Sequence, residues 1–170
     1  CQQLKGENFV NDGKQLVYHE QENGKRIQWH TLSVPRGGEY KLVLADGTRV
    51  WLNAASELMY PDHFSADQRK VVLKGEAYFE VTKDVKRPFS VVLGDMEVKV
   101  LGTSFNVSAY PGVKRQTTLI EGQVAVNWHR QQVVIRPGQQ AAETDEGLRV
   151  ASVNVMNYVG WKEHRFVYEN

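Results

Sequence analysis

Apolar and polar residues alternate with a period of two in the central stretch Val71–Val107. Between Leu73 and Val81 every second residue is small or apolar, and the residues between them are charged or aromatic. This period is typical of a β-strand with one buried face. The polar segment Thr82–Pro88 indicates a turn, and Phe89–Leu93 and Glu97–Val107 predict two further strands. We expect these strands to form a meander at the centre of the fold.

The apolar positions change parity near Gly102. Val98 and Val100 set one phase before it, and Phe105 sets the opposite phase after it. One extra residue restores the phase of a continuous strand, and glycine tolerates such an insertion well. The sequence therefore predicts a β-bulge at Leu101–Gly102.

A hairpin is predicted over Glu39–Asn53, around a three-residue loop, Ala45–Gly47. A two-residue loop would pair Leu44 with Arg49 and mix core and solvent positions, whereas this loop places the apolar residues of both strands on one face. It pairs Leu44 with Thr48, Leu42 with Val50, and Tyr40 with Leu52. A type I turn with a bulge requires a positive φ at Gly47, so replacement of Gly47 by valine is expected to destabilise the domain.

A further hairpin is expected over Gln15–His30, because Asn23–Gly24 is a strong two-residue turn signal. This turn places Tyr18 opposite Trp29. Such an aromatic pair serves either to cover the core or as a sugar-binding platform, and the pattern favours the first.

The C-terminal part is divided by Pro-Gly turns into short strands, at Thr117–Trp128, Gln131–Ile135 and Leu148–Val155. Asn154 can cap a short helix through about Trp161. The pattern predicts an all-β fold, either an antiparallel sandwich resembling a jelly roll or a β-solenoid, with at most a short C-terminal helix. We expect segment 1–34 to pack with residues 35–170 as one domain.

Composition narrows the functional classes. The 170 residues carry a formal net charge of +1, with lysine and arginine scattered, which argues against nucleic-acid binding. No apolar run approaches the roughly 20 residues of a membrane helix, and no signal peptide is visible. Cys1 is the single cysteine, so no intramolecular disulfide can form. We interpret Cys1 as an artificial chain boundary in preference to the lipidated first residue of a lipoprotein.

The sequence shows no arrangement typical of an enzyme. The five histidines are not spaced as metal ligands, and Ser104 is not in a nucleophile elbow. Glu76 and Glu80 share the polar face of one strand at a separation of about 13 Å. Glycosidase carboxylates lie about 5–9.5 Å apart. We therefore expect no catalytic, cofactor-binding or metal-binding residue and no cofactor.

Several motifs together resemble one protein family. The central ones are LKGEAYFEV (73–81), RPFSV (87–91) and VLGTSFNV (100–107). PRGGEY (35–40), LADGTRVWLNA (44–54), TTLIEG (117–122) and RPGQQA (136–141) extend the likeness. In this order the motifs resemble the periplasmic domain of FecR-type transmembrane sensors, from Pro35 to about Trp161.

The resemblance implies a function that the residues alone do not. FecR-type sensors are anti-sigma regulators anchored in the inner membrane. A cytoplasmic segment holds an extracytoplasmic-function sigma factor, and the periplasmic part receives the signalling domain of a TonB-dependent outer-membrane transducer. The cytoplasmic segment, the membrane helix and a further α/β signalling-type domain lie outside this sequence. The shared motifs are turns and core strands, so they transfer no partner-contacting residue.

A second interpretation is a carbohydrate-binding β-sandwich displayed as a lipoprotein through Cys1. Its candidate aromatic residues are Trp51, Tyr60, Tyr78 and Tyr110. A sugar site requires such side chains to converge on one concave, exposed patch. Scattered or buried side chains would exclude it.

Overall fold

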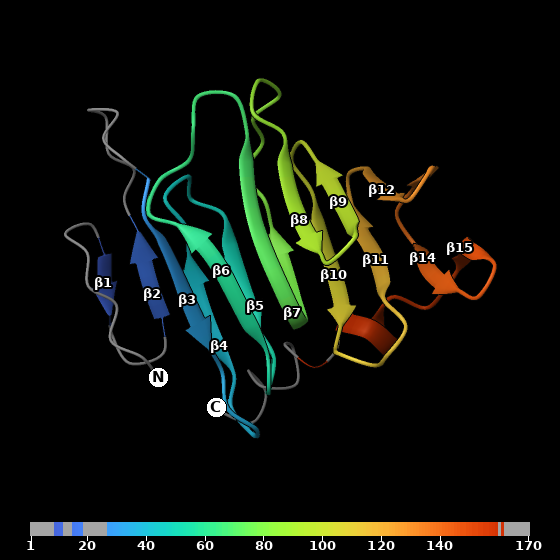
Figure 1. Ribbon diagram of the computed structural model, residues 1–170, viewed down its shortest axis with the longest axis horizontal. Helices are drawn as coiled ribbons and strands as arrows, with labels where there is room; N and C mark the ends of the chain where they lie inside the picture. Colours follow the sequence, from blue (N-terminus) through green and yellow to red (C-terminus); the bar gives the residue numbers. More distant parts are fainter. Residues whose placement is uncertain (1–8, 12–14, 19–26, 160, 162–170) are drawn as a thin grey trace.

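The computed structural model describes residues 9–11, 15–18, 27–159 and 161. They form two β-sheets that lie one behind the other, so strand labels of the two sheets alternate across Figure 1. A short helix begins at Met156. The prediction of an all-β fold with a short C-terminal helix is confirmed. None of the described helical residues forms a helix with the length and hydropathy needed to cross a bilayer.

The first sheet runs in the order β1, β2, β4, β5, β7, β10, β11, β14, β15. Its strands are β1 (Phe9–Asn11), β2 (Gln15–Tyr18), β4 (Tyr40–Val43), β5 (Arg49–Leu52), β7 (Arg69–Glu80), β10 (Ser104–Ala109), β11 (Gln116–Glu121), β14 (Gln139–Thr144) and β15 (Gly147–Ser152). The second sheet runs β3, β6, β7, β8, β9, β12, β13. Its further strands are β3 (Trp29–Ser33), β6 (Glu57–Pro61), β8 (Phe89–Leu93), β9 (Met96–Val100), β12 (Val124–Trp128) and β13 (Gln131–Ile135).

Strand β7 belongs to both sheets. Its first half pairs with β6 and β8 in the second sheet, and its second half pairs with β5 and β10 in the first. The change occurs at Gly75, where φ is +106°. A Cβ at Gly75 would lie 2.3 Å from Ser56 Oγ, which accepts a hydrogen bond from the Glu76 amide. Glycine is therefore required where β7 passes from one layer to the other.

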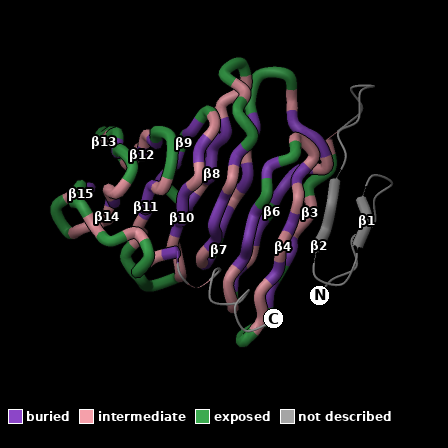
Figure 2. The backbone as a smooth tube through the Cα atoms, turned by 180° about the vertical axis from the view of Figure 1, so that it is seen from behind, coloured by how far each residue is buried: buried purple, intermediate pink, exposed green. Residues whose placement is uncertain are grey.

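Successive hairpins alternate between the layers (Figure 2). β8–β9 lies in the second sheet, β10–β11 in the first, β12–β13 in the second and β14–β15 in the first. β9 then pairs with β12, and β11 pairs with β14. The layers are those of a sandwich, whereas the advance of the hairpins along them resembles the turns of a solenoid.

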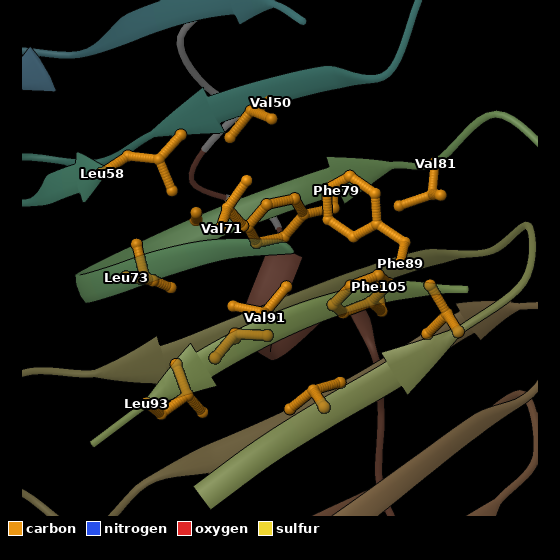
Figure 3. Packing of buried hydrophobic residues seen from close by; sticks show 14 of the residues in the cluster. Val50, Leu58, Val71, Leu73, Phe79, Val81, Phe89, Val91, Leu93 and Phe105 are labelled. Atoms are coloured by element: carbon orange, nitrogen blue, oxygen red, sulfur yellow. The ribbon is translucent and has the colours of Figure 1, made fainter. Parts of the chain in front are cut away.

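One hydrophobic core fills the space between the sheets (Figure 3). The first sheet contributes Val50, Phe79 and Phe105, and the second contributes Val91 and Leu93. The rings of Phe79 and Phe105 stack at a centroid distance of 5.1 Å. The inward positions predicted for the central strand are confirmed.

The two layers meet again at the far edge through one side chain. Gln131 of β13 accepts a hydrogen bond from the Leu148 amide at 2.7 Å and donates to the Leu148 carbonyl at 3.1 Å. Its amide thus takes the position that a neighbouring strand would have beside β15. This contact nearly closes the structure at that end.

The central hairpin β4–β5 has the predicted register. Leu42 faces Val50, and the Leu44 amide donates to the Thr48 carbonyl at 2.8 Å. Gly47 has a φ of +90°, as the three-residue loop requires.

The predicted N-terminal hairpin is wrong. Tyr18 pairs with Phe9, and Trp29 pairs with Pro61. β2 lies parallel to β4 in the first sheet, while β3 joins the second sheet and buries Leu32 in the core. A local turn signal does not decide which sheet a strand enters. The turn residues Asn23–Gly24 lie outside the described residues.

The predicted bulge and meander also need correction. β9 ends at Val100 and β10 begins at Ser104, so the chain changes layers at Leu101–Gly102. Strands in opposite layers face the core from opposite sides, which changes the parity without a bulge. The register shift lies opposite Ser104 and Phe105, on β11. β7 and β8 run parallel, so only β8–β9 forms a meander pair.

Candidate functional site

The four aromatic residues of the predicted sugar site do not converge on the surface. Tyr60 is fully buried in the core between the layers. Trp51 and Tyr78 are buried on the outer face of the first sheet. Tyr110 is partly buried and donates to the Ala54 carbonyl at 2.8 Å. The exposed aromatic platform that carbohydrate binding requires is not formed by these residues.

Trp51 and Tyr78 instead receive the C-terminal helix. Their rings lie 5.6 Å apart in an edge-to-face arrangement. Val159 of the helix is buried against them, and Ile120 and Trp161 pack at the side. We call these five residues the helix-docking cluster. Trp51 therefore packs beneath the C-terminal helix and does not form part of an exposed sugar site.

A polar network links the same helix to β10, to β7 and to Asn53, the residue that follows β5. Glu76 accepts hydrogen bonds from Asn53 Nδ2 at 3.0 Å and from Asn106 Nδ2 at 2.9 Å. Asn106 Oδ1 accepts from Trp161 Nε1 at 3.0 Å. Glu76 therefore holds neighbouring strands together and is not a solvated surface residue. Glu80 forms a separate ion pair with Arg49 at 2.5 Å.

The described residues contain no arrangement for metal binding. No group of three or more histidine, cysteine, aspartate or glutamate side chains is placed to hold an ion within the described part of the chain. His63 pairs with Asp62, and His129 lies 3.5 Å from Asp95. The expectation that the protein has no catalytic residue stays a prediction.

Sequence inspection missed the most unusual charged residue, Arg69. Its side chain is fully buried, and Nη1 donates to Asp46 Oδ2 and to the Thr82 carbonyl, both at 2.7 Å. Nε donates to the Arg87 carbonyl at 2.7 Å, and Nη2 reaches the Leu101 carbonyl at 3.2 Å. One signal was visible in the sequence: Arg69 occupies an inward position of the same alternation as Val71.

The hydrogen bonds of Arg69 converge on two loops that present exposed apolar side chains. Val85, in the loop between β7 and β8, is 61% exposed, and Leu101, between β9 and β10, is 44% exposed. The Asp84 amide donates to the Leu101 carbonyl at 3.0 Å, which joins the two loops. Lys83 and Lys86 are exposed on either side of Val85. We call Lys83, Val85, Lys86 and Leu101 the loop platform.

The charge of Asp84 is compensated within the same loop. Arg87 Nε donates to Asp84 Oδ2 at 2.9 Å, and this hydrogen bond lowers the pKa of the Asp84 carboxyl below its usual value. Lys83 and Lys86 are therefore the charges that dominate around Val85.

A different charged group lies at the turn between β8 and β9. Arg115 donates to Glu143 at 2.9 Å, to Asp95 at 2.7 Å and to the Leu93 carbonyl at 2.6 Å. The hydrogen bond with Arg115 lowers the pKa of both carboxyls. Leu93, Arg115 and Glu143 border a shallow hollow of about 570 Å³ beside Tyr110. Because the carboxylates are already paired with Arg115, the group ties loops together.

Comparison with known proteins places the chain in a family. The model of the FecR protein family matches residues 30–125, more than half of the 170 residues. The matched part runs from β3 into β12, and it includes Arg69, the loop platform and the strand shared by both sheets. No curated protein matches the chain.

Two crystal structures of a proposed anti-sigma factor from Parabacteroides distasonis ATCC 8503 are similar to it. The structure at 2.50 Å resolution has a TM-score of 0.77 and 32% identity, and covers 79% of this chain. The structure at 1.65 Å resolution has a TM-score of 0.75 and 32% identity over 78% of this chain. The chain spans 65% and 64% of the lengths of these two relatives. The motifs, the fold and the family match agree, and the chain belongs to the FecR family.

Proposed function

We propose that this chain is the periplasmic sensor region of a FecR-type anti-sigma regulator anchored in the inner membrane. In the whole protein, this region receives the signalling domain of a TonB-dependent outer-membrane transducer. A cytoplasmic segment of the same protein then controls an extracytoplasmic-function sigma factor. The observation that carries the proposal is the FecR match over residues 30–125, supported by the similarity to a proposed anti-sigma factor.

The described surface supports a binding role. The candidate carboxylates are engaged in structural pairs, because Glu76 holds Asn53 and Asn106 while Glu80 holds Arg49. The exposed side chains of Val85 and Leu101 lie on loops that are held in place by the buried side chain of Arg69. Such features favour contact with other proteins.

The test uses the whole protein solubilised from membranes in mild detergent. We expect it to co-purify with the sigma factor and, separately, to bind the purified signalling domain of its own transducer. A signalling domain from an unrelated transducer serves as the matched control. Absence of both interactions, with the protein folded and monodisperse, would contradict the proposal.

A further inference from the structure

We propose that the loop platform is the surface on which the transducer's signalling domain docks. The complementary surface is an apolar pocket bordered by acidic side chains. This inference rests on the proposed function and adds to it the location and chemistry of the contact.

Exposed apolar area is concentrated at the loop platform. Val85 and Leu101 come from different loops, yet the bond between the Asp84 amide and the Leu101 carbonyl brings their backbones together at 3.0 Å. Both side chains remain largely exposed. Neighbouring exposed apolar residues on a folded surface are typical of a protein contact, whereas single ones are common everywhere. In Figure 1 the loop between β7 and β8 protrudes at the upper edge, where a partner has access.

Hydrogen bonds to Arg69 hold the loop platform rigid. The guanidinium of Arg69 bonds the carbonyls of Thr82, Arg87 and Leu101, which lie in the same two loops. Asp46 compensates its charge from a third loop. Gly102 lets the loops approach, because a Cβ there would lie 2.6 Å from the Lys83 Cα. A surface held in one conformation before binding loses little entropy on docking, so these contacts prepare the platform for a specific partner.

The loop platform carries a positive charge. Lys83 and Lys86 are exposed beside Val85, while Asp84 is paired with Arg87. The field at the platform is therefore positive, and it complements an acidic border. A platform held in one conformation favours a partner with a fixed, complementary shape, and a fluid lipid surface has no such shape. For this reason we assign the platform to a protein.

The test measures binding of the purified signalling domain to the full-length regulator in detergent. The double variant Val85→Ser, Leu101→Ser removes the apolar contact, and Lys83→Glu, Lys86→Glu reverses the charge. We expect each to raise the Kd about tenfold or more, as is found for central contact residues. The charge-reversed variant should also show a weaker dependence of Kd on salt. The matched control is Val113→Ser, a 57% exposed valine in the turn after β10, which should leave the Kd within about twofold.

Each outcome has a distinct meaning. If the wild-type protein does not bind the signalling domain, the proposed function itself fails. If it binds, and both platform variants with unchanged thermal unfolding bind as the Val113 variant does, the platform is not the docking surface. Two further measurements are made on the same variants. One is binding to vesicles that contain anionic phosphatidylglycerol, and the other is self-association of the protein alone, measured by sedimentation. Loss of vesicle binding or of self-association in the platform variants, without loss of signalling-domain binding, would assign the surface to a membrane or to a second copy.

Discussion

The sequence reveals the structural role of Gly47 but not the roles of Gly75 and Arg69 in β7. Gly47 could be predicted, because its positive φ follows from the length of a local loop. Gly75 could be placed on the inward face, but its close approach to Ser56 depends on a segment far away in the chain. The burial of Arg69 likewise depends on carbonyl groups supplied by distant loops. Residue roles that arise from local geometry were predictable, and those that arise from tertiary contacts were not.

Replacement of Gly75 by alanine separates steric conflict from backbone strain. Gly75→Ala combines a positive φ with a Cβ 2.7 Å from the Ser56 Cα, so we expect a loss of about 4 kcal/mol or failure to fold. Gly138→Ala has a φ of +88° but no atom within 4 Å, so it should cost only about 1–2 kcal/mol. Urea denaturation gives both values. Equal losses for the two variants would contradict the close approach at Gly75.

Removal of the Arg69 charge leaves Asp46 buried without compensation. We expect Arg69→Met to lower the free energy of unfolding by about 3–5 kcal/mol. Asp46→Asn in the same background should cost less than it does alone, because the unpaired charge is then absent. A double-mutant cycle in urea measures this coupling. Strict additivity would show that the pair at 2.7 Å contributes nothing.

At the scale of elements, local hairpins were predictable and sheet membership was not. The alternation and the turn residues predicted β4–β5 with correct partners. The stretch Thr117–Trp128 was expected as one strand, but it is divided between β11 in the first sheet and β12 in the second. The N-terminal hairpin failed because β2 and β3 enter different sheets. The parity change near Gly102 was a true signal, but a change of layer has the same pattern in sequence as a bulge. Only the distant partners of each strand distinguish the two.

The contacts of Arg115 predict a pH dependence. Glu143 and Asp95 have pKa values below their ordinary 4.5 and 3.8, so the folded protein binds fewer protons than the unfolded chain. Their contribution to stability is therefore present above about pH 5 and is lost as the pH falls through the lowered values. Without Arg115 the two pKa values return toward their ordinary values. The free energy of unfolding of the Arg115→Met variant should therefore fall less than that of the wild type when the pH is lowered from about 6 to about 3.

The measurement is urea denaturation across that pH range. Lys114→Met is a suitable control, because the Lys114–Asp145 pair is exposed and such pairs contribute little. An unchanged pH profile in the Arg115 variant would contradict the assignment.

At the scale of the whole molecule, the C-terminal helix covers the outer face of the first sheet. The helix cap at Asn154 was predicted and is confirmed by the Met156 amide, which donates to Asn154 Oδ1 at 3.1 Å. The docking of the helix on Trp51 and Tyr78 was not predictable, because the alternation in β5 and β7 shows only that these two side chains face away from the core.

Val159→Asp should release the helix from the sheet. The aspartate would replace a buried valine of the helix-docking cluster, so we expect stability to fall by about 1.5–3 kcal/mol. Amides in residues 156–159 should exchange hydrogen faster in the same variant. Met156→Asp, at a 54% exposed position one turn away, should change neither quantity. Unchanged exchange in the Val159 variant would mean that the helix does not depend on this contact.

The sharing of β7 by both sheets has a consequence for how the protein opens. In a sandwich whose layers have separate strands, only the packing of side chains in the shared core couples the two layers. Here β7 is a central strand of both layers, so unfolding of β7 removes a central strand from each layer at once. We therefore expect the two layers to unfold together. Amides of β5 and β8, which lie in different sheets but both pair with β7, should exchange through the same global opening. The domain would then unfold as one cooperative unit, and a destabilising substitution in either layer would speed hydrogen exchange in both layers.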